Sequence, residues 1–397
     1  MSQISIFDGG ERLRFAKPIR LIELFAGIGS QAKAFERLGI PFEHYRICEF
    51  DKYAVTSYNA VHGTDFATSD ITALKGADLG IVDIDKYDYV MTYSFPCQDL
   101  SICGEGKGMA EGSGTRSALL WEVKRLLFEL DELPQILVME NVPQVIGAAN
   151  RKHFAEWVAF LDSLGYTSKW QVMNSKEYGV PQNRDRCFMV SWLGDYYYDF
   201  PEKIPLTKLL RDMLQPEDEV DEKYYLSEKG VKFILEPKRL GKYTQLINEE
   251  TDYVPCALTA KGNSNWTVNF VQCEPQLVGG FGEKKSNGGT QWDDFVVYDL
   301  YNKNQIDSDV LGTITSGCAR QGSGTFVVKD GKSPFRKLTQ LECWRLMDFD
   351  DADFYRAREA LNNAFYNGAD RSGSQLYKQA GNSIVVACLE AIFRQMI

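Results

Sequence analysis

Two reactive side chains follow apolar runs of this sequence. Cys97 comes after the run 87–93, which is aromatic and β-branched enough to form a buried strand. Because Pro96 cannot continue a central strand, we expect a turn that leaves Cys97 in a loop at the strand end. Glu140 ends a second apolar run, 135–139. Ligands gather at such strand ends in open α/β sheets, so the thiol and the carboxylate should face one crevice if their strands are neighbours.

A cysteine after a proline is, taken alone, more often a buried small hydrophobe than a nucleophile. Nearby cations strengthen the chemical interpretation of this one. Gln182, Arg184 and Arg186 occupy alternate positions of an extended segment that leads into a strand expected at 187–192. Alternation predicts that the three side chains share one face. A surface ladder of ion pairs is the alternative for the two arginines.

A glycine turn stands between the first expected strand, 19–25, and a helix that should end at Leu38, before Gly39. The turn has the pattern G-x-G-x-x-A over residues 27–32. Such a turn lets the backbone approach a nucleotide closely. On its own the pattern is weak evidence for a bound nucleotide.

Two acidic residues follow the glycine turn at the ends of expected strands. Glu49 ends the strand 44–48, where a carboxylate could hold both hydroxyls of a ribose. Asp70 ends a third short segment. These residues suit a nicotinamide dinucleotide and S-adenosylmethionine almost equally, because both molecules carry an adenosine. Helix capping is the alternative role of each carboxylate.

Five glycines lie among the eleven residues 104–114, directly behind the candidate nucleophile. We expect this segment to be a mobile loop that closes over the site as a lid. A helix should then begin at 115–117 and run to Leu130.

The regular alternation of strands and helices stops near residue 201. The following polar, glycine-broken sequence predicts a separate, irregular and β-rich module. Its segments 258–263 and 314–321 offer hydroxyls, amides and one cation each, on Thr259, Lys261, Thr315 and Arg320 among others. Such groups read base edges and phosphates, although ordinary turn chemistry explains them nearly as well.

A pattern typical of a helix returns at 336–347, where Thr339 and Glu342 have the spacing of a capping box. Near the end of the chain, Asn382 and Ser383 precede an apolar helix. They could cap this helix while facing the glycine turn, and capping alone is the simpler alternative.

The composition is that of an ordinary globular protein of 397 residues, with 44% hydrophobic and 25% charged residues. This length suffices for one large domain and a smaller one. Without a signal-like start or a long apolar run, a cytoplasmic protein without a membrane span is expected. Nine scattered cysteines and three histidines argue against a disulfide framework and a zinc site. The net charge of -11 argues against a non-specific nucleic-acid coat but allows a locally basic cleft.

The ordered motifs of the chain resemble those of the cytosine-5 DNA methyltransferases. The matching blocks span residues 19 to 395 in the family's order and lie at 25–29, 48–51, 70–71, 95–98, 140–142, 182–186, 336–339 and 381–383. No block departs from the family's pattern at a catalytic position. The family's variable target-recognition region would lie after residue 201, where the regular alternation of strands and helices stops.

This resemblance implies an α/β architecture, a Rossmann-like S-adenosylmethionine-dependent methyltransferase fold with a smaller, irregular β-rich target-recognition domain. The catalytic and cofactor-binding domain would span 1–200 and the target-recognition domain 201–335. The chain would then return to the catalytic domain, with its closing helix, over 336–397. The resemblance also decides between the two cofactors in favour of S-adenosylmethionine, which leaves as S-adenosylhomocysteine, and it implies no metal.

The catalytic roles implied by the resemblance fall on four residues. Cys97 would add to carbon 6 of cytosine as a thiolate. Glu140 would act as general acid at ring nitrogen 3 and read the exocyclic amine. Arg186, together with Arg184, would bind the carbonyl oxygen of the base and help to keep the thiol ionised. A water could take the proton lost from carbon 5.

The resemblance also implies two sets of binding residues. Cofactor contacts would come from Phe25, Ala26, Gly27, Ile28, Gly29, Glu49, Phe50, Asp70, Ile71, Pro96, Leu119, Asn382 and Ser383. Among these, Phe25 and Phe50 would pack around the cofactor, Glu49 would bind the ribose and Asp70 the adenine amine. DNA contacts are expected from Gln98, Ser101, Gln182, Thr259, Lys261, Thr315 and Arg320.

Three rival functions remain to be compared. Relatives with the same blocks methylate cytosine in transfer RNA, but the long module after residue 201 favours double-stranded DNA. A dinucleotide-dependent reductase would leave Cys97, Glu140 and the arginine pair without a task. A catalytically dead DNA-binding regulator should have lost Cys97 or Glu140. We expect a sequence-specific DNA methyltransferase that acts as a monomer in restriction-modification or phage/host DNA protection, with any restriction endonuclease encoded separately.

Overall fold

The computed structural model describes residues 10–96, 100, 109–110, 112, 114–225 and 336–397, together with the strand segments 269–272, 296–299, 304–306, 311–312 and 326–327. Its contacts divide the chain into two compact units. Unit 1 comprises Met1–Asn174, Asp185–Ile204 and Ile384–Ile397, and unit 2 comprises Ser175–Arg184 and Pro205–Ser383.

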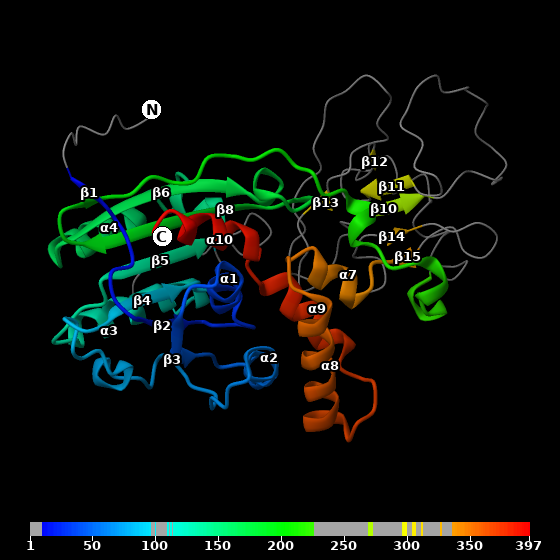
Figure 1. The fold of residues 1–397 in the computed structure, drawn as a ribbon, viewed down its shortest axis with the longest axis horizontal. Helices are drawn as coiled ribbons and strands as arrows, with labels where there is room; N and C mark the ends of the chain where they lie inside the picture. Colours follow the sequence, from blue (N-terminus) through cyan, green and yellow to red (C-terminus); the bar gives the residue numbers. More distant parts are fainter. Residues whose placement is uncertain are drawn as a thin grey trace. The chain divides into compact units, whose positions relative to one another are not determined.

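Unit 1 is built on a six-stranded sheet with the strand order β3-β2-β4-β5-β8-β6 (Figure 1). The strands are β2 (Ile19–Leu24), β3 (Phe42–Cys48), β4 (Asp88–Tyr93), β5 (Ile136–Asn141), β6 (Tyr166–Asn174) and β8 (Asp185–Leu193). Neighbours among β3, β2, β4 and β5 are parallel, whereas β8 runs antiparallel to both β5 and β6. The expected α/β class is therefore confirmed, and β4 and β5 are parallel neighbours.

All but the last of the described helices of unit 1 lie between these strands along the chain. The helices are α1 (Ser30–Leu38), α2 (Lys52–His62), α3 (Leu120–Glu129), α4 (Arg151–Ser163) and α10 (Val386–Arg394), with short 3-10 turns η1 (Gly76–Leu79), η2 (Arg116–Leu119) and η3 (Pro143–Ile146). A small parallel pair, β1 (Glu11–Arg12) with β9 (Tyr196–Tyr197), completes the unit. The helix expected from 115–117 to 130 thus consists of a 3-10 turn followed by α3. Within the described ranges, no helix combines the length and apolarity that crossing a bilayer requires.

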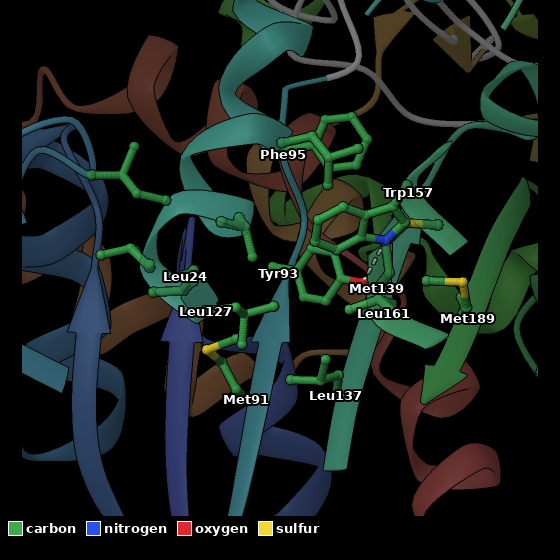
Figure 2. Close-up of a cluster of buried hydrophobic side chains, with 14 of the residues drawn as sticks. Leu24, Met91, Tyr93, Phe95, Leu127, Leu137, Met139, Trp157, Leu161 and Met189 are labelled. Atoms are coloured by element: carbon green, nitrogen blue, oxygen red, sulfur yellow. Dashed lines mark hydrogen bonds between the residues drawn. The ribbon is translucent and has the colours of Figure 1, made fainter. Parts of the chain in front are cut away.

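The sheet buries apolar side chains along whole strands, as parallel strands covered on both faces require. Every residue of β4 and β5 is buried. Figure 2 shows side chains of α3 and α4 packed with those of the strands, among them Leu127, Leu161 and Met139. In this cluster Trp157 Nε1 donates to Tyr93 Oη at 3.1 Å. Burial of each ring stabilises the fold by about 1.5–3 kcal/mol and anchors the end of β4 just before Pro96.

The first and last helices of unit 1 pack against each other. Phe35 of α1 stacks on Phe393 of α10, with ring centroids 4.3 Å apart. Helix α1 ends at Leu38, as expected, and Gly39 takes the left-handed conformation that closes it. The C-terminal helix therefore supports the helix that the glycine turn opens.

Among its described residues, unit 2 has three helices and short strands. The helices are α7 (Gln340–Arg345), α8 (Asp351–Tyr366) and α9 (Gly373–Asn382), and the 3-10 turns are η4 (Ser175–Tyr178), η5 (Leu210–Met213), η6 (Glu217–Glu219) and η7 (Glu222–Tyr224). The expected capping box is confirmed, because Thr339 Oγ1 accepts from Glu342 N–H at 3.2 Å and Glu342 Oε2 accepts from Thr339 N–H at 2.7 Å. Buried Trp344 packs edge-on against Phe354 and donates to Leu376 O at 3.0 Å, which joins α7, α8 and α9.

The strands of unit 2 form a five-stranded sheet with the order β12-β11-β10-β14-β15. They are β10 (Asn269–Gln272), β11 (Val296–Asp299), β12 (Asn304–Ile306), β14 (Phe326–Val327) and β15 (Arg336–Lys337). A separate parallel pair joins β7 (Gln182–Asn183) to β13 (Leu311–Gly312). The pairings between the described strands of this sheet are antiparallel, except that of β10 with β14.

The compact units follow boundaries that differ from those expected at 200 and 335. Only 384–397 returns to unit 1, whereas 336–383 belongs to unit 2. The reason is packing, since β15 pairs with β14 and the helices after it pack on one another. Segment 175–184 also belongs to unit 2, where Gln182 Nε2 donates to Leu346 O at 2.6 Å.

Candidate active site

The glycine turn after β2 has an unusual backbone. Phe25, Gly27 and Gly29 have φ angles of 60°, 58° and 81°, which lie in the left-handed region. A phenylalanine in this region carries strain, and such strain persists where the surroundings enforce it. Here the N–H groups of Phe25 and Ala26 both donate to Cys48 O, at 2.7 and 3.2 Å. The turn is thereby tied to the end of β3.

Glu49 connects the same two segments through its side chain. Its Oε2 accepts from Gly27 N–H at 2.9 Å and its Oε1 accepts from Asp51 N–H at 2.8 Å. Helix α2 is capped by Asp51, which accepts from Tyr53 N–H, so the capping alternative for Glu49 is wrong. Burial raises the pKa of the Glu49 carboxyl, while the N–H groups of Asp51 and Gly27 oppose this rise. A carboxylate oxygen offers two lone pairs, so ribose hydroxyls can bind beside these N–H groups.

An exposed aromatic ring adjoins this carboxylate. Phe50 is 76% exposed, which is unusual for a phenylalanine in a well-packed unit. Phe25, whose N–H donates to Cys48 O, is half-buried and packs against the main core. A flat apolar ring beside a carboxylate and a glycine turn suits the adenosine part of a cofactor, whose base can stack and whose ribose can donate.

Asp70 does not end a strand, in contrast to the expectation. Residues 64–70 are irregular, and Asp70 is an exposed residue whose Oδ1 accepts from the N–H and hydroxyl of Thr72 at 2.9 and 2.8 Å. These two bonds lower the pKa of Asp70. The polar sequence around Asp70 forms a turn because its own side chain satisfies the local N–H groups. Asp70 caps no helix either, because the next one, η1, has Lys75 as its N-cap, and Ile71 is buried.

The carboxyl ends of β4 and β5 lie side by side, with Tyr93 opposite Met139. Two side chains hold the backbone just before Cys97. Asn141 Nδ2 donates to Phe95 O at 2.9 Å, and Ser117 Oγ donates to Pro96 O at 2.8 Å. These bonds fix the direction in which the chain leaves β4.

Glu140 and Arg186 form an ion pair at this edge. Arg186 Nε lies 3.0 Å from Glu140 Oε1, and their side chains are 15% and 11% exposed. The antiparallel register of β5 and β8 explains the contact, because Glu140 lies opposite Phe188, two residues from Arg186. A carboxylate that is held by a guanidinium at a sheet edge can exchange protons with a bound base.

Arg184 and Gln182 have different partners, so the predicted shared face is wrong. Arg184 is buried and donates from Nη2 to Gly381 O and Ser383 O, at 3.1 and 2.7 Å. Gln182 is buried beside Leu346 O. The backbone explains the error, since Gln182 N–H donates to Val180 O and Arg184 N–H to Gln182 O, tight turns that separate the short strand β7 from β8 and interrupt the alternation. The guanidinium of Arg184 holds backbone in unit 2, and Gln182 is not at a surface that DNA could touch.

Asn382 and Ser383 also differ from expectation. Asn382 is the exposed last residue of α9, and Ser383 follows it as the C-cap. They do not cap the final helix, because α10 begins at Val386 with Val385 as its N-cap. In unit 1, Ile384 N–H donates to Ser30 Oγ at 3.3 Å, at the first turn of α1. Leu119 is half-buried against the main core.

Several expected site residues lie outside the described part of the chain. They are Cys97, Gln98, Ser101, most of the glycine-rich loop 104–114, Thr259, Lys261, Thr315 and Arg320. Their roles stay predictions. The sequence interpretation missed the clamp formed by Asn141 and Ser117, although Asn141 directly follows Glu140.

In the strand order, the antiparallel strand β8 lies next to the outermost strand, β6. This order and the glycine turn together define the class of the protein, a Rossmann-like α/β enzyme. The family follows from comparison with known proteins, since the model of the C-5 cytosine-specific DNA methylases matches residues 19–397. The chain belongs to this family and is a DNA cytosine-5 methyltransferase.

Similar proteins cover nearly the whole chain. The type II methyltransferase M2.ScrFI of Lactococcus lactis subsp. cremoris is 29% identical over 95% of this chain and 99% of its own. The orphan methyltransferase M.SPBetaI of Bacillus phage SPbeta is 26% identical over 96% and 97%. Among solved structures, the S. pombe Dnmt2 methyltransferase has a TM-score of 0.60 at 17% identity and covers 95% of this chain and 97% of its own. This last likeness shows the fold alone.

Proposed function

We propose that the enzyme methylates carbon 5 of cytosine within one short recurring sequence of double-stranded DNA, with S-adenosylmethionine as methyl donor. The observation that carries the proposal is the Glu140–Arg186 ion pair at the end of β5. Beside it, hydrogen bonds from Asn141 and Ser117 fix the backbone that follows β4. An acid, a cation and a fixed loop entrance are the groups that addition of a nucleophile to a pyrimidine requires.

The chemistry begins at carbon 6, because carbon 5 of cytosine is a poor nucleophile. Cys97 Sγ forms a bond to carbon 6 as Glu140 supplies a proton at nitrogen 3 and Arg186 binds the carbonyl oxygen. The electron-rich carbon 5 then takes the methyl group, which bound S-adenosylmethionine supplies as an electrophile on its sulfonium sulfur. Loss of the carbon 5 proton to a water breaks the carbon–sulfur bond and returns Cys97 as thiolate, and nitrogen 3 gives its proton back to Glu140.

The groups around the glycine turn would hold the cofactor. Exposed Phe50 offers a face for the adenine, and the Glu49 carboxylate lies where both ribose hydroxyls can donate to it. Asp70 is exposed, so its second carboxylate oxygen can accept from the adenine amine. Both the ring and the two carboxylates belong to unit 1.

The target base must leave the duplex to reach this edge, at a cost of about a few kcal/mol of unstacking. We assign the reading of the flanking sequence to the part of unit 2 between 205 and 335, whose short strands could present loops to base edges. The enzyme would work as a monomer in the cytoplasm, flipping one base at a time. The type II and orphan relatives support a role in DNA protection, with any endonuclease on a separate chain.

The test is base-resolution sequencing of unmethylated genomic DNA after incubation with the protein and S-adenosylmethionine. We expect 5-methylcytosine at one recurring motif, and none with the Cys97→Ala variant, which should still bind the cofactor. Unmodified DNA after incubation with cofactor-binding wild-type protein would contradict the proposal, and transfer RNA would then be the next substrate. Full activity of Cys97→Ala would remove the assigned nucleophile.

A further inference from the structure

Two of the three histidines and a glutamate meet behind the glycine turn. Glu36 lies on α1, His44 on β3 and His62 at the end of α2. Each contributes a ligand atom, and these atoms all lie within 4.8 Å of one another. The side chain of His62 is fully buried, whereas Glu36 keeps 31% of its side chain exposed and so leaves a route from solvent.

Hydrogen bonds at the far side of each ring fix which nitrogen carries the proton. His62 Nε2 lies 3.1 Å from Ile28 O, which can only accept, so Nε2 must donate. Tyr58 donates its hydroxyl proton to Glu23 Oε2 at 2.5 Å. Tyr58 Oη therefore accepts from His44 Nδ1, which lies 3.0 Å away. The nitrogens left for ligation are His62 Nδ1 and His44 Nε2.

Both of these nitrogens face the same carboxylate. His62 Nδ1 lies 2.6 Å and His44 Nε2 lies 3.9 Å from Glu36 Oε1. A nitrogen lone pair and a carboxylate oxygen repel each other unless a positive charge lies between them. A proton on His62 removes the repulsion at only one of the two contacts, and the contact with His44 remains. The ammonium group of Lys33 lies 3.5 Å from the other oxygen of Glu36, Oε2, and so does not lie between Oε1 and the imidazoles.

In contrast to the expectation from composition, we propose that Glu36 Oε1, His44 Nε2 and His62 Nδ1 bind one Zn²⁺ ion, with a water as fourth ligand. Two imidazoles and a carboxylate are a ligand set that zinc accepts. Donation from the second ring nitrogen to a backbone carbonyl or a polar side chain is the arrangement that orients metal-binding histidines. Ligands of a tetrahedral zinc ion lie about 3.3 Å apart, so the exposed Glu36 carboxylate swings outward as the ion enters.

The site would act on the glycine turn through His62. The imidazole holds Ile28 O, and a Cβ on Gly29 would collide with its Nε2 and with the Tyr58 ring. A metal-fixed His62 would therefore hold residues 27–29 in place. Because the argument uses unit 1 contacts only, it does not depend on the substrate proposed above.

The experiment uses the full-length protein after treatment with a chelator. Calorimetric titration with Zn²⁺ at pH 8 should show one ion per chain with a Kd of about 1 μM or tighter, and Co²⁺ should give a visible spectrum without a sulfur charge-transfer band. His44→Gln and His62→Gln should each weaken binding by at least about tenfold. His153→Gln is the matched control, since His153 pairs only with Glu156 on α4 among the described residues, and it should bind like wild type.

Three results would overturn the site. One is the absence of saturable Zn²⁺ binding by the folded wild-type protein, which would mean that a proton on His62 alone neutralises the charge of Glu36. Another is unchanged binding by a folded His44→Gln variant, with circular dichroism as the check of folding. A third is a sulfur charge-transfer band with Co²⁺, which would place the ion on cysteines instead.

Discussion

Arg186 Nε lies 3.0 Å from Glu140 Oε1, on the strand that runs antiparallel to β5. This register positions the pair without help from any loop. Each charge is mostly removed from water, and removing one partner of such a pair leaves the other uncompensated, which typically costs about 3–5 kcal/mol. The guanidinium is therefore as necessary for holding Glu140 as for any contact with a base.

Glu140→Gln should lower the rate of methyl transfer by about 10²–10⁴-fold, because the amide cannot supply a proton to nitrogen 3. Cofactor affinity should change little, since Glu49 and Phe50 remain in place. Single-turnover transfer from labelled S-adenosylmethionine and calorimetric cofactor binding measure the two effects. Glu156→Gln removes an exposed carboxylate on α4 and should leave the rate unchanged. A wild-type rate for Glu140→Gln would remove its assignment as the acid.

A second prediction concerns the clamp before Cys97. Ser117→Ala removes the donor to Pro96 O, and Asn141→Ala the donor to Phe95 O. Each loss should destabilise the fold by about 1 kcal/mol and lower kcat by about tenfold or more, because a misplaced reactive group is costly. The KM for S-adenosylmethionine should stay within about twofold, since no ribose contact changes.

Ser163→Ala provides the matched control for this clamp. Ser163 also donates to a backbone carbonyl, that of Phe160 at 2.6 Å, but on the exposed side of α4. Steady-state kinetics of the three variants, with urea unfolding for stability, would test the idea. If Ser117→Ala and Asn141→Ala lost stability yet kept the wild-type kcat, the clamp would be structural only.

The parallel core could be predicted from the sequence because its residues leave little choice. Continuous apolar runs such as 136–139 suit only strands covered on both faces, and Gly39 closes α1 through a left-handed conformation that favours glycine. These features depend on local pattern and burial, which a single sequence carries.

The errors arose where side chains bind backbone that is distant in the sequence. Alternation failed for Arg184 because two tight turns interrupt the strand and Gly381 O, almost two hundred residues away, provides its partner. No local pattern reveals such a carbonyl. The same holds for His44 and His62, which are separated along the chain and meet only because β3 and α2 lie behind the glycine turn.

A third prediction uses the exposed ring beside Glu49. Phe50→Ala should weaken S-adenosylmethionine binding by about ten- to a hundredfold, because stacking of a base on an aromatic ring is worth about 1–3 kcal/mol. Stability should change little, since the ring is 76% exposed. Phe128→Ala is the matched control, because that ring is 78% exposed and belongs to another element, α3. Equal cofactor affinity of both variants would exclude Phe50 from the binding site.

The last prediction concerns Glu23, a carboxyl buried in β2 just before the glycine turn. Burial is the main cause that raises its pKa from 4.5 to about 7, against the hydroxyl of Tyr58, which favours the charged form. Between these two values the native state keeps a proton that the unfolded chain has released. The contribution of Glu23 is therefore most favourable at low pH and is lost as pH rises through about 7, at an order-of-magnitude cost of about 3 kcal/mol.

Glu23→Gln removes this titration while its amide oxygen can still accept from Tyr58. The free energy of unfolding of the variant, relative to that of wild type, should be higher at pH 8 than at pH 5. A cost of the amide that is the same at both pH values does not affect this comparison. Glu129→Gln should show no such change, because the N–H of Gly76 and the guanidinium of Arg125 lower the pKa of Glu129, so that this carboxyl is charged in the folded and the unfolded chain at both pH values. Urea unfolding of the three proteins at both pH values measures these differences. A Glu23→Gln difference that does not change with pH would mean that Glu23 stays charged in the folded protein across this range, with Tyr58 and Ala32 N–H compensating its burial.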